Sequence, residues 1–570
     1  MINQENERRE RLLDQISRGV IDRRSLIRLI GTASATSLLA SIAADTAFAA
    51  GDVQAANRAA LRGSYDYIIV DAGASGSVIA SELAKSGADI LLVESGGMDD
   101  GPTITNPSVW FQNIGGPLDW SLPIQPSPRL ANRQFRLALG RVLGGGSSIN
   151  AMVWSRGMQR DFDGWAANGA QGWSFKDVLP IFKAQEDWEG GANALRGVGG
   201  PIHIRIPKNP HPTAPAFIEA ARQMGIPIHA DLNGPMQEGA GYINMNIATD
   251  GTRISASRAF LRPNLSRRNL TLLTNAHVTK LSFAGTRCSG VELLIDGQQH
   301  QIGASREVIL AAGGVGSAKL LMLSGLGDAA ELRSLGIAPV EDLKGVGRSY
   351  HDHVLLSGVA FEYRGKMPDR SADSNAVEAE AYLSSGVDNG GVDLALILEQ
   401  LPAVTPEAAA RFGAPPADTF VIAPALVRPE SRGIVRLTSS NWQDPLVING
   451  NYLGTDRDLE AIVRGIELAR ELGGQRAFDG VRAREVVPGP KATRSELREL
   501  AQLASSSFGH PTGTCRIGTD KLAVVDPELR VHGIQNLRVA DSSVMPSVPA
   551  AATSAAAHMI GGKAAALLQA

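Results

Sequence analysis

The sequence is poor in cysteine and in blocks of like charge, and each shortage excludes a class of protein. Cys288 and Cys515 are the two cysteines, too few for a disulfide framework. The formal net charge is −3 and no long basic block is present, so no nucleic-acid partner is expected. The nearest approach to a cluster of metal ligands is His351, Asp352 and His353. A structural role is the better interpretation of these three residues, so no metal site is expected.

The chain is long and rich in glycine. At 570 residues it is long enough to bury a large core and to form two or more domains. Hydrophobic residues make up 44% and charged residues 20%, which is the balance of a globular protein. The 62 glycines, beside only 5% aromatic residues, indicate an α/β enzyme with many tight turns.

Residues 1–49 are predicted to be an export signal rather than part of the fold. Arg23 and Arg24 precede a mildly apolar stretch at 29–44, and an A-x-A motif follows at 47–49. This pattern resembles a twin-arginine signal peptide with its cleavage site. An N-terminal membrane anchor is the alternative, but the apolar stretch is short and rich in Ala, Ser and Thr. The mature chain is therefore expected to be periplasmic or secreted, with no membrane span.

The segment YDYIIVDAGASGSVIASELAKSGADILLVESGG (65–97) has the pattern of strand, glycine turn, helix and strand. Gly73 and Gly76 fit a dinucleotide-binding turn, and Glu94 fits the carboxylate that holds a ribose. Asp71 stands where the pattern begins with glycine, and its carboxylate would repel a pyrophosphate by roughly 4 kcal/mol at ~4 Å. An ordinary βαβ crossover without a cofactor is the alternative for this segment taken alone.

A second segment, GRVLGGGSSINAMVWSRG (140–157), is a run of small residues that leaves little bulk to keep the backbone from a flat cofactor. Together with the glycine turn it indicates a flavin enzyme rather than a nicotinamide enzyme. A strand, glycine turn and helix at 306–327 are expected to close back on the nucleotide domain, as is the strand and final helix of 509–570.

The rest of the chain alternates between helical and strand patterns. Helical spacing covers 161–186, and 456–472 has the pattern of an amphipathic helix. Apolar residues alternate with polar ones in 270–296 and again in segments of 355–447, which predicts strands. The predicted fold class is α/β, with a Rossmann-like FAD-binding domain and a second, substrate-binding domain built on an antiparallel sheet.

Several segments, in the same order along the chain, resemble motifs of the glucose–methanol–choline (GMC) oxidoreductases, flavoenzymes that oxidise alcohols. These segments are GRVLGGGSSIN (140–150), GGVGSAKLLMLSGLG (313–327), VGRSYHDH (346–353), SRGIVRLTSSNWQDPLVINGNYL (431–453), HPTGTCRIG (510–518) and DPELRVHGIQNLRVADSSVMP (526–546). The resemblance runs from Tyr65 to the C-terminus. It implies an FAD-binding domain made of 65–345 plus 505–570, and a substrate-binding domain at 346–504.

The resemblance also implies where FAD binds. The glycine turn and Glu94 would hold the ADP half, 150–153 would line the isoalloxazine ring and ribityl chain, and Asp541 and Ser542 would meet the ribityl-phosphate region. The residues implied in cofactor binding are Gly73, Ser75, Gly76, Glu94, Gly144, Ser148, Asn150, Ala151, Met152, Val153, Val278, Asp541, Ser542 and Thr553. Some family members attach FAD covalently through a histidine where this chain has Ile149, so non-covalent FAD is expected.

The catalytic constellation implied by the resemblance is incomplete. His510 is the expected base, because the pKa of histidine lies near working pH. The family's second His or Asn is replaced by Ala552, for which Thr553, Ser554 or His558 are possible substitutes. The expected activity is oxidation of a small-molecule alcohol, with oxygen, a quinone or a cytochrome as the final electron acceptor. A lyase on the same scaffold and a catalytically impaired flavoprotein are the alternatives.

Overall fold

The computed structural model describes residues 54–387 and 391–570. The predicted signal peptide at 1–49 lies outside these residues and stays a prediction. Within the described ranges, no helix has both the length and the apolar character that a membrane crossing requires. The unit Arg62–Ala570 contains both of the large sheets.

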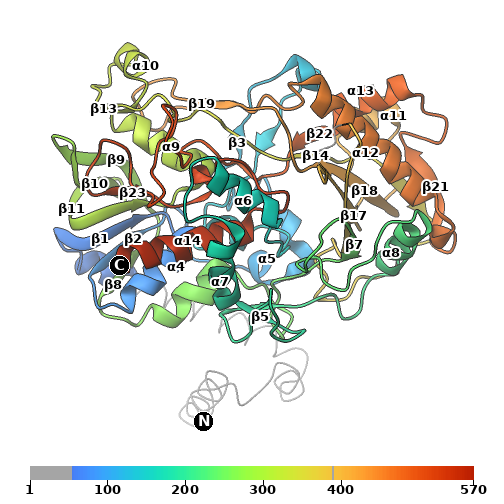
Figure 1. Cartoon of the computed structure of the whole chain (residues 1–570), viewed down its shortest axis with the longest axis horizontal. Helices are drawn as coiled ribbons and strands as arrows, with labels where there is room; N and C mark the ends of the chain where they lie inside the picture. Colours follow the sequence, from blue (N-terminus) through green and yellow to red (C-terminus); the bar gives the residue numbers. More distant parts are fainter. Residues whose placement is uncertain (1–53, 388–390) are drawn as a thin grey trace, which may run out of the picture. The chain divides into compact units, whose positions relative to one another are not determined.

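The first sheet consists of seven strands, at the left of Figure 1. They are β1 (Ser64–Val70), β2 (Ile90–Val93), β8 (Leu270–Leu273), β9 (Ala276–Ala284), β10 (Arg287–Ile295), β11 (Gln298–Leu310) and β23 (Leu537–Val539). Their order is β8-β2-β1-β11-β10-β9, with β23 also paired to β11. β8, β2, β1, β11 and β23 pair in parallel, whereas β9, β10 and β11 pair in antiparallel fashion. The expected Rossmann-like half of the fold is confirmed.

The register of β1 places the glycine turn at one edge of this sheet. β2 is entirely buried, as is the second half of β1, which explains why ILLV and the YIIV end of β1 are continuous apolar runs. Val70 pairs with Val93 on one side and with Leu310 on the other. The C-terminal ends of β1 and β11 are therefore adjacent, and the turns that follow the two strands are neighbours.

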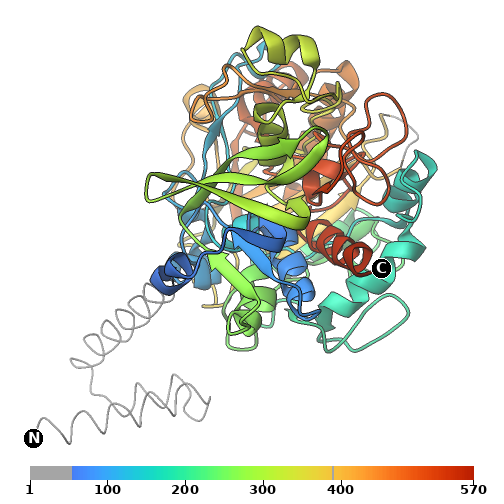
Figure 2. The same cartoon turned by 90° about the vertical axis from the view of Figure 1, so that its left-hand side faces the viewer.

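Three helices begin at this edge: α4 (Ala74–Ala84), α9 (Gly313–Leu323) and α14 (Ser554–Gln569). The C-terminal helix α14 lies against α4, and Figure 2 shows it beside the first sheet. The Ser75 hydroxyl donates to the Ala557 carbonyl (2.7 Å). The approach requires Gly561, because an added Cβ there would lie 2.7 Å from the Ser75 carbonyl oxygen. The C-terminal residues therefore contribute β23 to the first sheet and α14 to its flank.

The second sheet has eight strands, at the right of Figure 1. They are β7 (Gly239–Tyr242), β14 (Val354–Leu356), β15 (Ala360–Tyr363), β16 (Ala379–Leu383), β17 (Leu394–Glu399), β18 (Thr419–Leu426), β21 (Arg482–Val487) and β22 (Ser505–Ser507). All of their pairings are antiparallel, as expected. β7 and β22 come from outside 346–504, so segments from both sides of the predicted division contribute to this sheet.

One face of the second sheet is covered by α12 (Asp456–Gly474), the predicted amphipathic helix. At Gly465 the helix passes so close that an added Cβ would lie 2.9 Å from Pro424 and 3.4 Å from Leu394. Side chains alternate along a strand, so Leu394 and the residues two and four positions further along β17 face the helix. The intervening residues, Ala395, Ile397 and Glu399, face the opposite side.

The remaining helices and short strands connect the two sheets. The predicted helical segment 161–186 consists of two helices, α6 (Gln159–Ala167) and α7 (Phe175–Gln185), because Gly169 (φ +100°) and Gly172 (φ +81°) turn the chain between them. The other helices are α5 (Pro102–Thr105), α8 (Thr213–Gln223), α10 (Ala329–Ser334), α11 (Pro406–Phe412) and α13 (Arg494–Ala504). The other strands are β3 (Leu122–Pro123), β4 (Arg136–Leu137), β5 (Glu186–Trp188), β6 (Ile202–Ile204), β12 (Leu326–Gly327), β13 (Glu341–Asp342), β19 (Ile434–Arg436) and β20 (Val447–Asn449).

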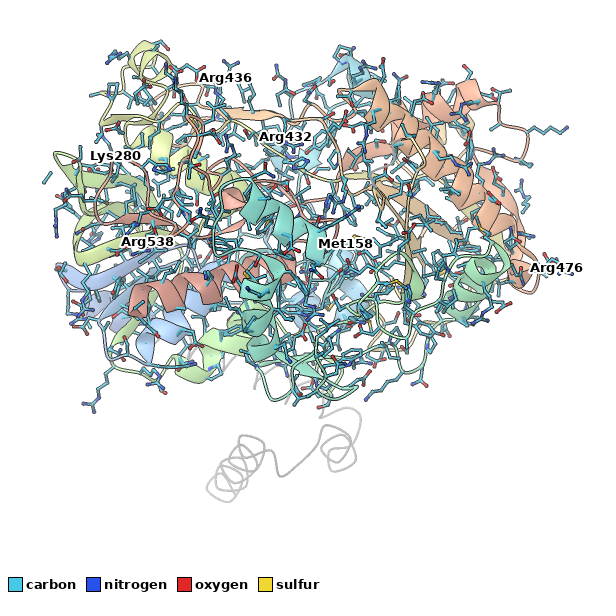
Figure 3. The ribbon with its side chains drawn as sticks, in the orientation of Figure 1. Met158, Lys280, Arg432, Arg436, Arg476 and Arg538 are labelled. Atoms are coloured by element: carbon cyan, nitrogen blue, oxygen red, sulfur yellow. The ribbon has the colours of Figure 1, made fainter. Side chains whose placement is uncertain are left out.

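Some charged side chains are exposed, and others form ion pairs between neighbouring strands. Lys280 of β9 and Arg476, which follows α12, are exposed (Figure 3). Arg538 of β23 forms an ion pair with Glu307 of β11 (2.6 Å), and Figure 3 labels this arginine. The ion pair joins the C-terminal strand to the centre of the first sheet.

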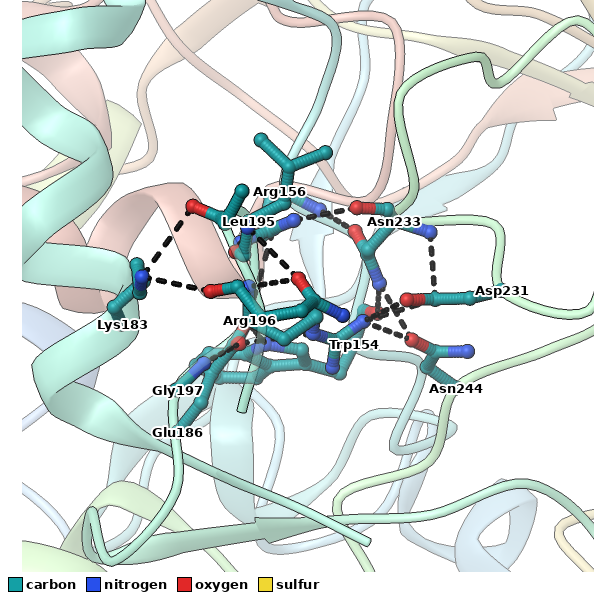
Figure 4. A network of polar contacts seen from close by, with 12 residues as sticks. Trp154, Arg156, Lys183, Glu186, Leu195, Arg196, Gly197, Asp231, Asn233 and Asn244 are labelled. Atoms are coloured by element: carbon teal, nitrogen blue, oxygen red, sulfur yellow. Dashed lines mark hydrogen bonds and ion pairs between the residues drawn. The ribbon is translucent and has the colours of Figure 1, made fainter. Parts of the chain in front are cut away.

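A buried network of ion pairs holds the segment that follows the small-residue loop, and Figure 4 shows it. The Trp154 indole donates to Glu186 Oε1 (2.9 Å), and Arg196 pairs with Glu186 (3.0 Å) and with Asp231 (2.9 Å). Burial lowers the pKa of Arg156, which also faces Glu186, to about 10. Loss of one partner would leave a buried charge uncompensated. The network therefore fixes the backbone immediately after Asn150–Val153.

Candidate active site

A cavity of about 850 Å³, here called the central cavity, contains the candidate site. Its walls come from the turns after β1 and β11, from the small-residue loop, from the start of α14 and from the uncovered face of the second sheet. His510 also lines it. The elements that sequence patterns assigned to a cofactor, to a substrate domain and to catalysis therefore meet in one place.

Two helices begin at the central cavity without a capping side chain. Gly73 precedes α4 and Thr553 precedes α14, and neither helix has a side-chain cap. The first backbone N–H groups of a helix lack intrahelical partners and carry partial positive charge. Gly73, Ala74, Ser75 and Thr553 all line the cavity. Such helix starts fit the anionic groups of a dinucleotide.

The glycines of the two predicted cofactor segments lie against one another. A Cβ added to Gly145 would lie 2.8 Å from the Gly73 Cα, and one added to Gly76 would lie 2.0 Å from the Asp71 carbonyl oxygen. Gly146 has open space around it and is exposed to the cavity. The backbone thus carries no side chains where a flat, extended cofactor would lie, so the residues present fit FAD.

The structure brings most of the predicted cofactor residues to the cavity wall, but not all. Those that line it are Gly73, Ser75, Asn150, Ala151, Val153, Val278, Asp541, Ser542 and Thr553. Those that do not line it are Gly76, Glu94, Gly144, Ser148 and Met152. Gly144 (φ +86°) and Met152 (φ +57°) shape the loop, and the Ser148 hydroxyl donates to the Leu143 carbonyl (2.7 Å). Asp541 holds the start of α9 by accepting from the Gly313 N–H (3.0 Å).

Asp71 lies at the cavity, and its carboxyl group is hydrogen-bonded to that of Glu94. The Glu94 carboxylate also accepts from the Ala72 N–H (3.0 Å) and the Gly96 N–H (2.7 Å). Burial and the charge of Glu94 raise the pKa of Asp71 well above its usual range. Two carboxyl groups bond only when they share a proton. The repulsion expected of a fully charged Asp71 is therefore reduced by that proton.

The loop that carries His510 is fixed by Asp352. The Asp352 carboxylate accepts from the His510 N–H (2.9 Å), from the hydroxyl groups of Tyr452 (2.6 Å) and Ser507 (2.5 Å), and from that of Tyr350 (3.1 Å). Burial raises the pKa of Asp352, and these donors oppose the rise. A buried carboxylate with so many donors resists displacement. It therefore sets the position of His510.

His353 is a site residue that sequence reasoning missed. It lines the cavity, and its Nδ1 lies 2.9 Å from His510 Nδ1. His351, for which a structural role is also expected, accepts from the Val548 N–H (3.0 Å), whereas His353 lies in the cavity wall. The two paired histidines are 157 positions apart in the chain. The signal that could have found His353 is its place in the VGRSYHDH motif.

The histidine pair leaves one nitrogen of His510 able to accept a proton. In the tautomer in which His510 Nδ1 donates to His353, the lone pair of His510 is on Nε2. Burial lowers the pKa of His510 to about 4, so the ring is neutral at pH 7. A neutral imidazole is the form that a general base requires.

Ala552 stands at the position where the family's second catalytic His or Asn is expected, and it lines the cavity. Among its possible substitutes, Thr553 and Ser554 line the cavity as well. His558 does not, because it packs against Trp154 and Phe260 and its Nδ1 donates to the Ser554 carbonyl (2.7 Å). His558 is therefore excluded as the partner of His510.

Comparisons with known proteins agree with this site. Models of the N-terminal and C-terminal parts of the GMC oxidoreductases match residues 65–355 and 429–561. An oxygen-dependent choline dehydrogenase of Sinorhizobium medicae is 36% identical, over 88% of this chain and 94% of its own. The mitochondrial choline dehydrogenase of Mus musculus is 35% identical over 89% of each chain. Pyridoxine 4-oxidase from Mesorbium loti has a similar structure, with a TM-score of 0.84 at 31% identity, covering 88% of this chain and 98% of its own.

We predict that Asp71→Gly tightens FAD binding. Asp71 has φ +80°, a left-handed conformation that costs a non-glycine residue about 1–2 kcal/mol. Its carboxyl group is also hydrogen-bonded to that of Glu94. Because the shared proton is lost as pH rises, the affinity of the parent protein should fall with increasing pH, and that of the variant should change less. The measurement is the FAD dissociation constant of both proteins across pH.

Two further variants separate charge from backbone strain. Asp71→Asn keeps the side-chain volume but cannot ionise, so it should remove the pH dependence while keeping the strained turn. Asp296→Gly relieves an exposed left-handed aspartate (φ +51°) that does not itself line the cavity, and should leave the affinity unchanged. Weaker FAD binding by Asp71→Gly at every pH would show that Asp71 holds the cofactor.

Proposed function

The chain belongs to the GMC oxidoreductases, and from that premise we propose that it oxidises the CH–OH group of a primary or secondary alcohol to a carbonyl. The observation that carries the proposal is the pair His510 and His353, held at 2.9 Å in a cavity that two uncapped helix starts also reach. GMC oxidoreductases bind FAD, and the bare glycine backbone beside those helix starts fits it. The cited relatives act on choline and pyridoxine, as their names state.

In the proposed reaction a residue of this chain accepts a proton from the substrate, and the cofactor would accept two electrons. FAD would be held by the small-residue loop and the two helix starts, and would supply the acceptor for the hydride of the alcohol carbon. Nε2 of His510 accepts the hydroxyl proton, so that the alcohol loses a hydride and a proton in total and becomes a carbonyl. His353 orients the His510 ring through Nδ1, and Asp352 holds the backbone of the same loop. Residues 150–153, anchored by the ion-pair network, would line the cofactor.

We predict that His510→Ala slows flavin reduction by about 10²–10⁴-fold, the contribution of a positioned base. FAD content and fold should be retained, because the side chain faces the cavity rather than the core. The measurement is the anaerobic rate of flavin reduction by the best alcohol substrate. His532→Ala is the matched control, since His532 contacts the Gly518 carbonyl away from the cavity lining. An unchanged rate in His510→Ala would place the base elsewhere.

The same measurement tests whether a hydrogen-bonding partner is missing at Ala552. Ala552→Asn should speed flavin reduction, because the amide supplies the hydrogen bond to the substrate oxygen that alanine lacks. Slower reduction would mean that alanine provides space for a bulky substrate. If no alcohol bleaches the flavin band of the parent protein, a lyase or an impaired flavoprotein becomes the better interpretation. Repetition of the substrate screen with oxygen and with a dye acceptor distinguishes an oxidase from a dehydrogenase.

We predict that FAD is bound non-covalently, because Ile149 stands at the position of the covalent histidine and carries no nucleophilic atom. Acid precipitation should release the yellow colour into the supernatant. Colour retained in the washed pellet would contradict the prediction, and its attachment to a peptide would then be located by mass spectrometry.

We propose that the enzyme is exported through the twin-arginine route, on the support of the sequence at 1–49 alone. Replacement of both Arg23 and Arg24 by lysine should hold the protein in the cytoplasm, because the twin-arginine signal requires the arginine pair. The measurement is the fraction of the protein in the periplasm and medium of the producing cells. Arg28→Lys is the control and should leave export unchanged. Equal export of the double variant would contradict this route.

A further inference from the structure

Two glutamates lie on the face of the second sheet that lines the central cavity. Glu380 of β16 pairs with Ile397 of β17, and Glu399 lies two residues further along β17. Diagonal neighbours of this kind have Cα atoms about 7–8 Å apart. Both side chains line the cavity, as does Tyr382 of the same face. The alternate residues of β17 face α12, so the strand register itself directs the two carboxyl groups into the cavity.

Neither glutamate has a cationic partner among residues 54–387 and 391–570. Glu380 is only 5% exposed. Burial raises the pKa of Glu380 to about 7 and that of Glu399 to about 7. Buried carboxylates are ordinarily paired with a cation or with several donors. Glu186, for example, has Arg196 at 3.0 Å. Glu380 is hydrogen-bonded to the Tyr382 hydroxyl, but neither Glu380 nor Glu399 faces a cationic side chain among the described residues, so the missing positive charge is a feature of this cavity wall.

The positive side chains of the cavity are engaged elsewhere. Lys319 Nζ donates to the Trp442 carbonyl (2.6 Å), and Arg136 Nε donates to the Ser121 carbonyl (2.7 Å). Neither raises or lowers the pKa of Glu380 or Glu399. The charge that would balance an ionised glutamate is therefore not supplied by the chain.

Aromatic side chains accompany the two acids. Trp110, Tyr382 and Phe508 line the same cavity, and the Trp110 indole is fixed by donating to the Asn375 carbonyl (2.8 Å). The faces of aromatic rings attract cations. His510 and Phe508 have ring centroids 4.5 Å apart, so this aromatic wall is continuous with the proposed base.

We propose that Glu380 and Glu399 form a binding subsite for a positively charged group, so that the substrate is an alcohol that also carries an ammonium centre. This inference rests on the proposed function and restricts the class of alcohol that the enzyme oxidises. The ammonium would lie against the second sheet while the hydroxyl group faces His510. Neutral aromatic alcohols and polyols fill the same space without balancing the acids, and are poorer substrates.

The first test compares isosteric alcohols with the flavin-loaded parent protein. Choline is compared with 3,3-dimethylbutan-1-ol, and 4-aminobutan-1-ol with pentan-1-ol, because each pair differs mainly in charge. We expect kcat/KM for the cationic member of at least one pair to exceed that of its neutral partner by at least about tenfold. Equal or better use of the neutral member in both pairs would overturn the inference.

The second test removes the charges one at a time. Glu380→Gln and Glu399→Gln keep the side-chain volume and should each lower kcat/KM for the cationic alcohol by about tenfold or more, leaving the neutral isostere unchanged or improved. Glu362→Gln is the matched control, since Glu362 lies on β15 of the same sheet but pairs with Arg484 outside the cavity. Equal losses for cationic and neutral alcohols would show a purely structural role and overturn the inference.

The third test does not depend on turnover. Tetramethylammonium, which has no hydroxyl group, is titrated into the parent and into the double glutamine variant by calorimetry. Binding to the parent but not to the variant supports the subsite, even if no alcohol reduces the flavin, in which case the proposed function alone fails. Reduction of the flavin by alcohols without any preference for charge, together with no binding of tetramethylammonium, overturns the inference and leaves the proposed function intact.

Discussion

The hydrogen bonds of the Asp352 carboxylate are the constraint on which the arrangement of the active site depends. This carboxylate is buried at the junction of the segment before β14, the loop that carries His510 and the loop that carries Tyr452. Each of these segments presents a donor to the same two oxygens. A buried carboxylate is stable only when its acceptor sites are filled, so none of the three segments can shift alone. The position of the base is thereby coupled to the start of the second sheet.

Patterns in the sequence were sufficient for the fold because each strand has a distinct environment. The glycine turn after β1 indicates a nucleotide-binding sheet, and the short apolar segments of β16 and β17 indicate a second sheet, whereas the positive-φ glycines mark where α6 and α7 separate. The site was predicted less completely. His353 and His510 are brought together by sheet pairing across 157 positions, and no local pattern records such a contact. Similarly, alternation shows that Glu380 is on one face of a strand, but only the packing of α12 shows which face is covered.

Asp71 illustrates why a departure from a motif is difficult to interpret until the residues that contact it in the folded chain are known. In isolation, a carboxylate beside a pyrophosphate is simply unfavourable. In the folded chain its neighbour is Glu94, and the two acids together hold a proton. The effective charge at the turn is therefore a property of the pair, and it depends on pH in a way that neither residue would show alone. Glu94 does not line the cavity and is hydrogen-bonded to Asp71, which a pattern based on spacing does not reveal.

The two uncapped helix starts have a consequence for the life of the protein before it meets its cofactor. The starts of α4 and α14 bring partial positive charge to one cavity, and α14 packs directly on α4. An occupant that binds only the folded chain stabilises it by mass action, by about 4.1 kcal/mol at a free concentration 1,000 times its dissociation constant. The start of α14, which packs on α4, is also part of the cavity wall. An occupant of this cavity therefore stabilises the fold together with the packing of α14 on α4, and the free energy of unfolding rises with the concentration of that occupant.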